Sequence, residues 1–225
     1  MKSSLLLYCE RINNAAEPVN VISNLGFMAV SLTVLCLLRR HKDQSPKQPT
    51  VSWMLWILSL LPLMIGLGSA AYHHSPSNFT LALDLGPIGL FAGGALFLSL
   101  RHIVGLSRSQ AGVYLSVWLL ATAIAAPWPG YFFGSLIYVP TSIALLLVAT
   151  KTRNHLIMIA AILFFLALLM RSLDLPLCEK LTTGTHPFWH LIAAVVSLLI
   201  LLALRSAMQT QPCNQSHQPP QSHKD

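Results

Sequence analysis

Long apolar runs separated by short polar connections constrain the fold of this chain more than any other feature. A helix that crosses a bilayer needs about 20 mostly apolar residues, and seven stretches approach that requirement. They are residues 19–38, 53–72, 79–99, 111–126, 130–150, 155–171 and 187–205. The fourth stretch is the weakest, because it is short and is ended by Pro127 and Pro129. We therefore predict an all-α membrane protein, a bundle of seven transmembrane helices without an extramembrane domain.

The composition excludes several other classes of protein. Only 9% of the residues are charged and 54% are hydrophobic, whereas a soluble domain has about 25% charged residues. These values exclude a soluble enzyme, a disordered chain and a nucleic-acid-binding protein. The net charge of +7 does not indicate nucleic-acid binding, because the basic residues lie in short connections between apolar runs. Residues 1–206 form the predicted membrane domain, and residues 207–225 form a predicted disordered cytoplasmic tail. No signal peptide is expected, since Met1 to Leu7 is too short for its apolar core.

The basic residues also predict an orientation, because cytoplasmic connections collect Lys and Arg. With the N-terminus outside, ten basic residues fall on the cytoplasmic side and four fall outside. The four outside are Lys2, Arg11, Arg171 and Lys180. We therefore expect the N-terminus outside and the C-terminus in the cytoplasm. The short connections and small size favour a multi-pass protein of a prokaryotic inner membrane, with its reactive side chains at the non-cytoplasmic face.

Three histidines at the outer ends of two predicted helices indicate a metal site. His186 and His190 are spaced i, i+4, which puts both imidazoles on one helix face at a spacing that helical zinc sites use. Taken alone, the pair is equally well explained as two interfacial histidines, because two ligands are half a metal site. His73 follows Ser69 at the same spacing near the end of the second helix, and His74 points about 100° away from His73.

Asp84 lies inside the apolar run of the third predicted helix. An intramembrane carboxylate is costly and is usually functional; the alternative is a structural ion pair, for instance with Arg171. Three histidines and a water make a catalytic zinc site, beside which Asp84 would orient or deprotonate the water. Ser69 would donate to an oxyanion, and its alternative is a hydrogen bond to its own helix backbone. This set predicts a hydrolase for acyl bonds, and its position within the bilayer predicts a lipid substrate.

The order of these motifs resembles the alkaline ceramidase family, which belongs to a superfamily of seven-helix membrane hydrolases that includes the adiponectin-receptor-like proteins. The motifs are Cys9-Glu10, Glu17-Pro-Val-Asn20 with Ser23-Asn24, Ser69-x-x-x-His73, Asp84, Arg171-x-x-Asp174 and His186-x-x-x-His190. The resemblance implies an amidase that cleaves ceramide into a fatty acid and a sphingoid base. It further implies that His73, His186 and His190 hold zinc, that Asp84 acts on the water at the metal, and that Ser69 assists.

The N-terminal motif departs from the family. Eukaryotic members are expected to bind calcium through an Asp two residues before the Cys, through Glu residues and through an Asn. Glu10 and Glu17 are retained here, but Leu7 and Ile12 stand at the positions of the Asp and the Asn. Calcium takes six to eight oxygen ligands, so these changes count against a calcium site. The alternative is that Glu17 and Asn20 cap and anchor the first helix.

Two of the four cysteines, Cys9 and Cys178, fall on the predicted outer side, where disulfides persist. A bond between them would tie the N-terminal segment over the loop that leads to His186. The alternative is two unrelated thiols.

Two further functions stay open beside a zinc-dependent amide hydrolase. One is a non-enzymatic lipid-binding or receptor-like membrane protein; the co-occurrence of Ser69, Asp84 and three histidines favours the enzyme over it. The other is a transporter that uses Asp84 and the histidines as a proton relay. The sequence has no repeated half-pattern or pair of broken helices, which are common in transporters.

Overall fold

Every regular element in the described part of the chain is a helix. The computed structural model describes residues 7–14, 16–44, 53–128 and 134–209. The helices in chain order are α1 (Cys9–Asn14), α2 (Pro18–Ser23), α3 (Leu25–Gln44), α4 (Trp53–His74), α5 (Asn78–His102), α6 (Arg108–Ala125), the short 3-10 helix η2 (Leu136–Tyr138), α7 (Val139–Thr152), α8 (His155–Leu173) and α9 (His186–Gln209). Residues 210–225, most of the tail that the sequence analysis expects, lie outside the described residues.

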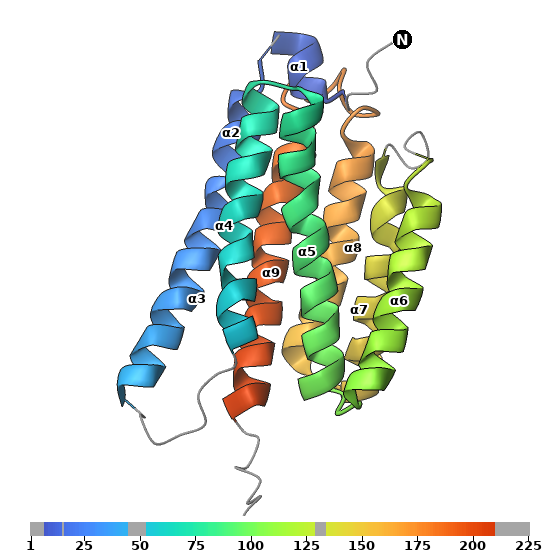
Figure 1. The fold of residues 1–225 in the computed structure, drawn as a ribbon. Helices are drawn as coiled ribbons and strands as arrows, with labels where there is room; N and C mark the ends of the chain where they lie inside the picture. The colour runs from blue at the N-terminus through green and yellow to red at the C-terminus, as the bar shows by residue number, and fades with distance from the viewer. Residues whose placement is uncertain (1–6, 15, 45–52, 129–133, 210–225) are drawn as a thin grey trace, which may run out of the picture.

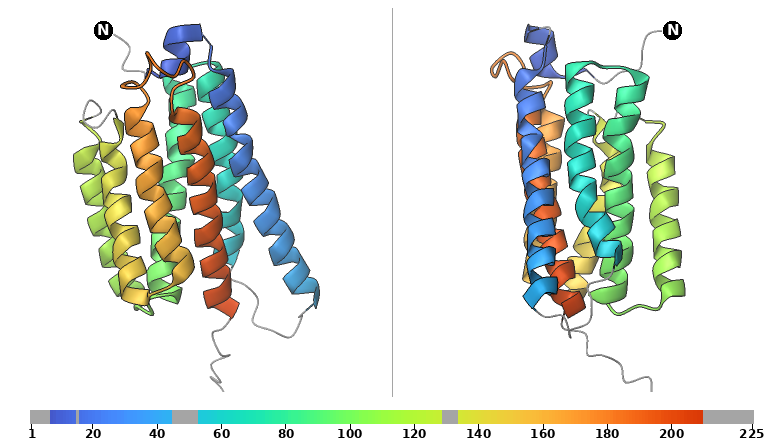
Figure 2. Two further views of the ribbon diagram at one scale, coloured as in Figure 1. Left: turned by 180° about the vertical axis from the view of Figure 1, so that it is seen from behind. Right: turned by 60° about the vertical axis from the view of Figure 1, so that its left-hand side comes forward.

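The long helices run side by side in one bundle, and α1 lies across one end of it (Figure 1). Helix α9 contacts α2, α3, α4, α5 and α8, and its side with Phe188, Leu191 and Val195 is exposed. The two further views in Figure 2 agree with this arrangement and place α6 and α7 at the edge away from α3. Helix α9 therefore packs against helices from both the beginning and the end of the chain.

Five helical segments of the described chain are long and apolar enough to cross a membrane, as an integral membrane protein requires. They are Pro18–Arg40, Trp53–His74, Asn78–His102, His155–Leu173 and His186–Gln209. The segment Leu136–Thr152 is apolar but shorter. Helix α6 is not among the five, and it carries Arg108, Gln110 and Ser116 in its 18 residues. The predicted all-helical fold is thus confirmed for the described residues, and five of the seven expected spans are long and apolar enough to cross a membrane.

Large apolar side chains cover the outer surface of the bundle. Exposed examples on five different helices are Leu32, Ile57, Leu90, Val117 and Ile162. An apolar surface of this extent is unsuited to water and marks a surface that contacts a membrane or a partner. It fits the five segments that are long enough to span a bilayer.

Two glycines let α4 approach its neighbours closely. A side chain at Gly68 would overlap the backbone carbonyl of Leu83 in α5, and one at Gly66 would crowd the Asn24 carbonyl at the start of α3. Small residues at helix interfaces permit this kind of backbone approach in membranes. Because Asp84 is the next residue after Leu83, the contact at Gly68 brings the polar residue of α5 against α4.

The connection between α8 and α9 is tied to α1 by one carboxylate. Asp174, which ends α8, accepts hydrogen bonds from the backbone N–H groups of Thr185 and His186 at 2.8 and 2.9 Å through Oδ1. Its Oδ2 accepts the backbone N–H of Cys9 at 2.9 Å. Gly184 has a positive φ of 68°, and a side chain there would overlap Asp174. Asp174 therefore fixes the start of α9 relative to α1.

The disulfide that the sequence analysis expects between Cys9 and Cys178 is present in the structure. Their Cα atoms are 5.3 Å apart, and 169 residues separate them in the sequence. The bond holds α1 against the α8–α9 connection, beside the bonds made by Asp174. The entrance to α9 is thus fixed both covalently and by hydrogen bonds.

Candidate metal centre

Three buried imidazoles meet at the end of the bundle that carries α1. His73 comes from the last turn of α4, His186 begins α9, and His190 lies one turn further along α9. Each offers one ligand nitrogen, and these nitrogens all lie within 4.8 Å of one another. In the residues that the structure describes, no other group of three His, Cys, Asp or Glu side chains meets this criterion. His74, the neighbour of His73, is exposed and takes no part.

Hydrogen bonds fix the ring orientation of two of these histidines. Nδ1 of His73 contacts Oε2 of Glu17. Nδ1 of His190 lies 2.7 Å from the Ser23 hydroxyl oxygen, and that hydroxyl donates to the Asn20 carbonyl at 2.8 Å. Because Ser23 uses its own hydrogen on Asn20, its oxygen accepts from the imidazole. Assigned from this network, both rings carry hydrogen on Nδ1 and direct the Nε2 lone pair inward.

Two nitrogens of the group have no protein partner. Nε2 of His73 and Nδ1 of His186 are buried and accept or donate no hydrogen bond. A buried polar atom left in this state costs about 1–3 kcal/mol, and a metal ion bound by the nitrogens removes that cost. Three neutral imidazoles with a fourth position open are also a ligand set of catalytic metal sites. The residues therefore fit a metal ion.

Ser69 and Asp84 lie beside the histidines. Ser69 is one turn before His73 in α4, is 2% exposed, and places its hydroxyl 3.4 Å from Nε2 of His190. Asp84, in the second turn of α5, is 6% exposed, and its carboxylate interacts with the Ser69 side chain. Both residues line the same cavity as His186 and His190. A hydroxyl and a carboxylate therefore flank the metal-binding group from two helices.

Arg171 is buried in the same cavity wall, with no described carboxylate within ion-pair distance of its guanidinium. Its guanidinium lies 5.4–5.7 Å from the ring centres of Tyr8, Tyr138 and Trp189. It donates to the Tyr8 hydroxyl at 3.3 Å, and its Nε has no hydrogen-bond partner. Among the described residues, ion pairs form only at Glu17. The structural ion pair between Asp84 and Arg171 that the sequence allows is therefore not formed.

Tyr8 covers the group from the side of the N-terminal segment. Its ring stacks on the imidazole of His186, with centroids 3.9 Å apart. Burial raises the pKa of the Tyr8 phenol, so the hydroxyl keeps its hydrogen at neutral pH. Tyr8 thus packs the N-terminal segment against His186.

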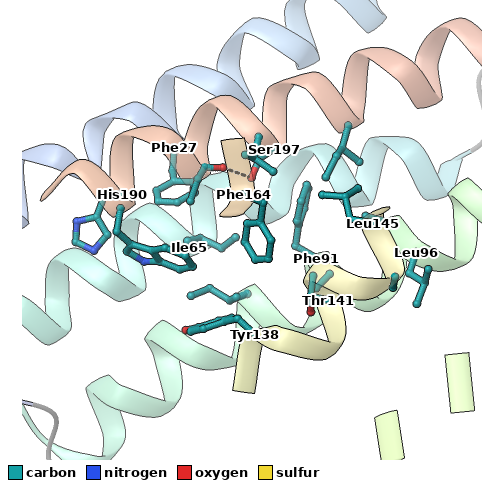
Figure 3. A pocket seen from close by; sticks show the side chains of 18 of the residues that line it. Phe27, Ile65, Phe91, Leu96, Tyr138, Thr141, Leu145, Phe164, His190 and Ser197 are labelled. Carbon is teal, nitrogen blue, oxygen red and sulfur yellow. Dashed lines mark hydrogen bonds between the residues drawn. The ribbon is translucent and has the colours of Figure 1, made fainter. Parts of the chain in front are cut away.

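An apolar cavity extends from the histidines toward the middle of the bundle (Figure 3). It starts at His186 and His190 and continues along α9 to Ile200, about 15 Å from His190 at ~1.5 Å per residue. Its deeper walls are mostly apolar, with Phe91 and Phe164 among the side chains drawn in Figure 3. The cavity is thus polar at the end that carries the histidines and mostly apolar along the rest of its length.

The two glutamates that the sequence analysis considers for calcium are bonded to protein donors. Both oxygens of Glu10 accept backbone N–H groups at the start of α2, from Val19 at 2.8 Å and from Asn20 at 2.9 Å. Glu17 precedes α2 but makes no side-chain capping bond to it. The cap of this helix is thus Glu10 rather than Glu17.

Glu17 instead faces His73, Arg11 and the side chain of Asn20. Burial alone would raise the pKa of Glu17, but the hydrogen bond from His73, the Asn20 amide and the Arg11 guanidinium together lower it below its usual value. The carboxylate is therefore held ionised by protein groups. This contact and the Ser23–His190 bond were not predicted from the sequence, because both depend on how α2 packs against α4 and α9. Their only signal in the sequence is the presence of four polar residues at the start of an apolar span: Glu17, Asn20, Ser23 and Asn24.

No family model matches this chain, and no curated protein matches it either.

Proposed function

We propose that this protein is a zinc-dependent intramembrane amide hydrolase, similar to the alkaline ceramidases, which cleaves a lipid N-acyl bond into a fatty acid and an amine. The amine is a sphingoid base if the substrate is ceramide. One observation carries the proposal: three buried histidine nitrogens lie within 4.8 Å of one another at one end of an apolar cavity that Asp84 and Ser69 also line. A site for a metal ion therefore adjoins an apolar cavity that can accept a lipid chain.

Zinc is the metal that we assign to the site. Imidazole nitrogens suit zinc, and three protein ligands leave a fourth position for water or substrate. When bound, zinc would polarise the amide carbonyl and lower the pKa of water to about 7. The unpartnered nitrogens of His73 and His186 support this assignment.

Asp84 is the proton carrier of the proposed reaction. Water adds to the amide carbonyl carbon, and the Asp84 carboxylate accepts the proton that the water releases. The same proton passes to the amide nitrogen as the C–N bond breaks, which yields a carboxylic acid and an amine. General acid–base catalysis of this kind contributes typically 10²–10⁴-fold.

Ser69 and Arg171 stabilise the negative charge that develops on the carbonyl oxygen. The Ser69 hydroxyl is close to His190 and to Asp84, where it can donate a hydrogen bond to that oxygen. Arg171 adds a positive charge to the wall of the same cavity. Such fixed donors and charges are most effective in a site from which water is excluded.

The topology completes the proposal. We place α6 and the segment η2–α7 as two further crossings, which makes seven with the five segments already identified. The N-terminus lies outside, the C-terminus in the cytoplasm, and the site in the outer leaflet of a prokaryotic inner membrane. The distribution of Lys and Arg supports this orientation.

Hydrolysis of a labelled lipid panel tests the function. The purified full-length chain would be given ceramide, other N-acyl lipids and an ester analogue, with and without a metal chelator. We expect fatty acid release from the amide substrates, its loss with chelator and its recovery with zinc. Lipid binding without any release would instead favour the non-enzymatic lipid-binding protein.

A further inference from the structure

We propose that Glu17 is a positioning residue, which orients His73 as a ligand of the metal site. Arg11 supplies the positive charge that balances the Glu17 carboxylate, so that Arg11, Glu17 and His73 act together. The inference rests on the proposed function in one respect only, that His73 is a metal ligand. It assigns roles to two residues of the N-terminal segment that touch neither the cavity nor the metal.

Glu17 uses both carboxylate oxygens on groups that surround His73. Oε2 contacts Nδ1 of His73 and accepts the Asn20 amide at 2.9 Å, and Oε1 pairs with Nε of Arg11 at 2.5 Å. The Glu17 side chain is almost completely buried, so water does not compete for these oxygens. A carboxylate that accepts a hydrogen bond from the other ring nitrogen of a ligand histidine fixes its tautomer and orientation and makes the ligand nitrogen more basic.

Arg11 holds His73 from two directions. Its Nη2 donates to the backbone carbonyl of His73 at 2.8 Å, while its Nε pairs with Glu17. The carbonyl belongs to the last turn of α4, where backbone oxygens lack helical partners and where a cation is favourable. One guanidinium thus fixes both the backbone of the ligand histidine and the carboxylate that orients its ring.

The charge of Arg11 also explains how Glu17 can remain ionised in this place. A buried carboxylate needs a compensating positive charge, and Arg11 supplies one from within the chain. The positive charge that a calcium ion would bring to this carboxylate is therefore already present. Helix α1, which carries Arg11, is itself held by the Cys9–Cys178 disulfide.

A purely structural role is the competing explanation. In that case the ion pair of Arg11 and Glu17 only holds the N-terminal segment against α4, and its loss lowers stability without changing the metal site. The two explanations differ in metal affinity and coordination, which can be measured whether or not the lipid substrate is known.

The experiment uses Co²⁺ as a probe in the purified full-length chain, because its visible absorption reports coordination geometry. Glu17→Gln is expected to weaken Co²⁺ binding by about 10–100-fold, the range for outer partners of metal ligands, and to change the spectrum. Glu10→Gln is the matched control, since Glu10 is a buried carboxylate of the same segment that bonds only backbone N–H groups. It should lower thermal stability and leave Co²⁺ affinity unchanged.

Arg11→Gln provides a second variant at a partly exposed position, so the test does not depend on the folding of Glu17→Gln. We expect a smaller loss of Co²⁺ affinity than for Glu17→Gln, and no gain in the wild-type affinity when calcium is added to calcium-free protein. If the affinities and spectra of both variants equal those of Glu10→Gln, Glu17 and Arg11 do not orient His73, and the proposed function is unaffected. A wild-type chain that binds no Co²⁺ would overturn both.

Discussion

At the end of the cavity next to α1, hydrogen bonds between distant parts of the chain fix the side chains, whereas along the deeper cavity the walls are apolar side chains held by packing. Helix α9 contributes to both regions: His186 and His190 lie in its first two turns, and Ala193, Val196 and Ile200 follow on the cavity side. The polar end depends on single atoms such as the Ser23 oxygen. The deeper part depends on volume and shape.

Substitutions in the two regions are therefore expected to have different effects. If the proposed function holds, a change at the polar end removes a particular donor, acceptor or ligand and should therefore act on metal binding and chemistry. Apolar cores tolerate substitutions that keep their total volume. A substitution in the apolar part that changes the cavity volume should therefore act mainly on which lipid chain is accepted. The four predictions below test this separation, from the largest expected effect to the smallest.

His186→Ala should have the largest effect. It removes one of three ligand nitrogens and also the ring that stacks on Tyr8. We expect loss of bound zinc and a fall of lipid hydrolysis to the level seen with chelator, measured by metal analysis and fatty acid release. His74→Ala, which changes an exposed neighbour of the group, is the control and should keep both. Unchanged metal content in His186→Ala would remove this residue from the site.

Asp84→Asn should separate chemistry from metal binding. The amide keeps the shape of the carboxylate and loses its basicity, so turnover should fall by about 10²–10⁴-fold. Asp84 is not one of the three grouped histidines, so zinc should stay bound at the wild-type level. Turnover and metal content would be measured on the same preparation, and a fully active variant would leave Asp84 a structural role only.

Ser23→Ala should have a smaller effect, through metal affinity. The variant loses the oxygen that accepts from Nδ1 of His190, and outer partners of this kind account for about 10–100-fold in metal affinity. Ser59→Ala is the matched control, because Ser59 is buried but donates to the carbonyl of Leu55 in its own helix. Equal zinc affinities of the two variants would contradict the orienting role of Ser23.

Local spacing predicts the parts of the site that each helix supplies by itself. The i, i+4 pairs of His186 with His190 and of Ser69 with His73 lie in α9 and α4, as expected, and Asp84 lies buried in α5. These placements follow from helix periodicity and hydropathy, which a sequence carries directly.

The tertiary partners of the site do not follow from local spacing. Glu17 meets His73 across 56 residues, and Ser23 meets His190 across 167. Such contacts depend on how α2 packs between α4 and α9, which hydropathy does not encode. The span expected at residues 130–150 is not among the five long apolar segments for a different reason: α7 has only 14 residues, and η2 extends it at its start. Apolar composition locates such a segment but does not set its helical length.

Ala95→Leu should have the smallest effect and should act only on chain length. Ala95 is buried in α5 and lines the apolar part of the cavity away from the histidines, so a larger side chain shortens the available space. A change of one methylene in an apolar pocket changes discrimination by about 10–200-fold, and we expect the lower end because the neighbouring side chains can adjust. The kcat/KM for a long-chain substrate should fall about 10-fold, whereas short-chain substrates and zinc content should be unaffected. An equal loss for all chain lengths would mean that Ala95 acts on the polar end as well, and that the two regions of the cavity are not separable.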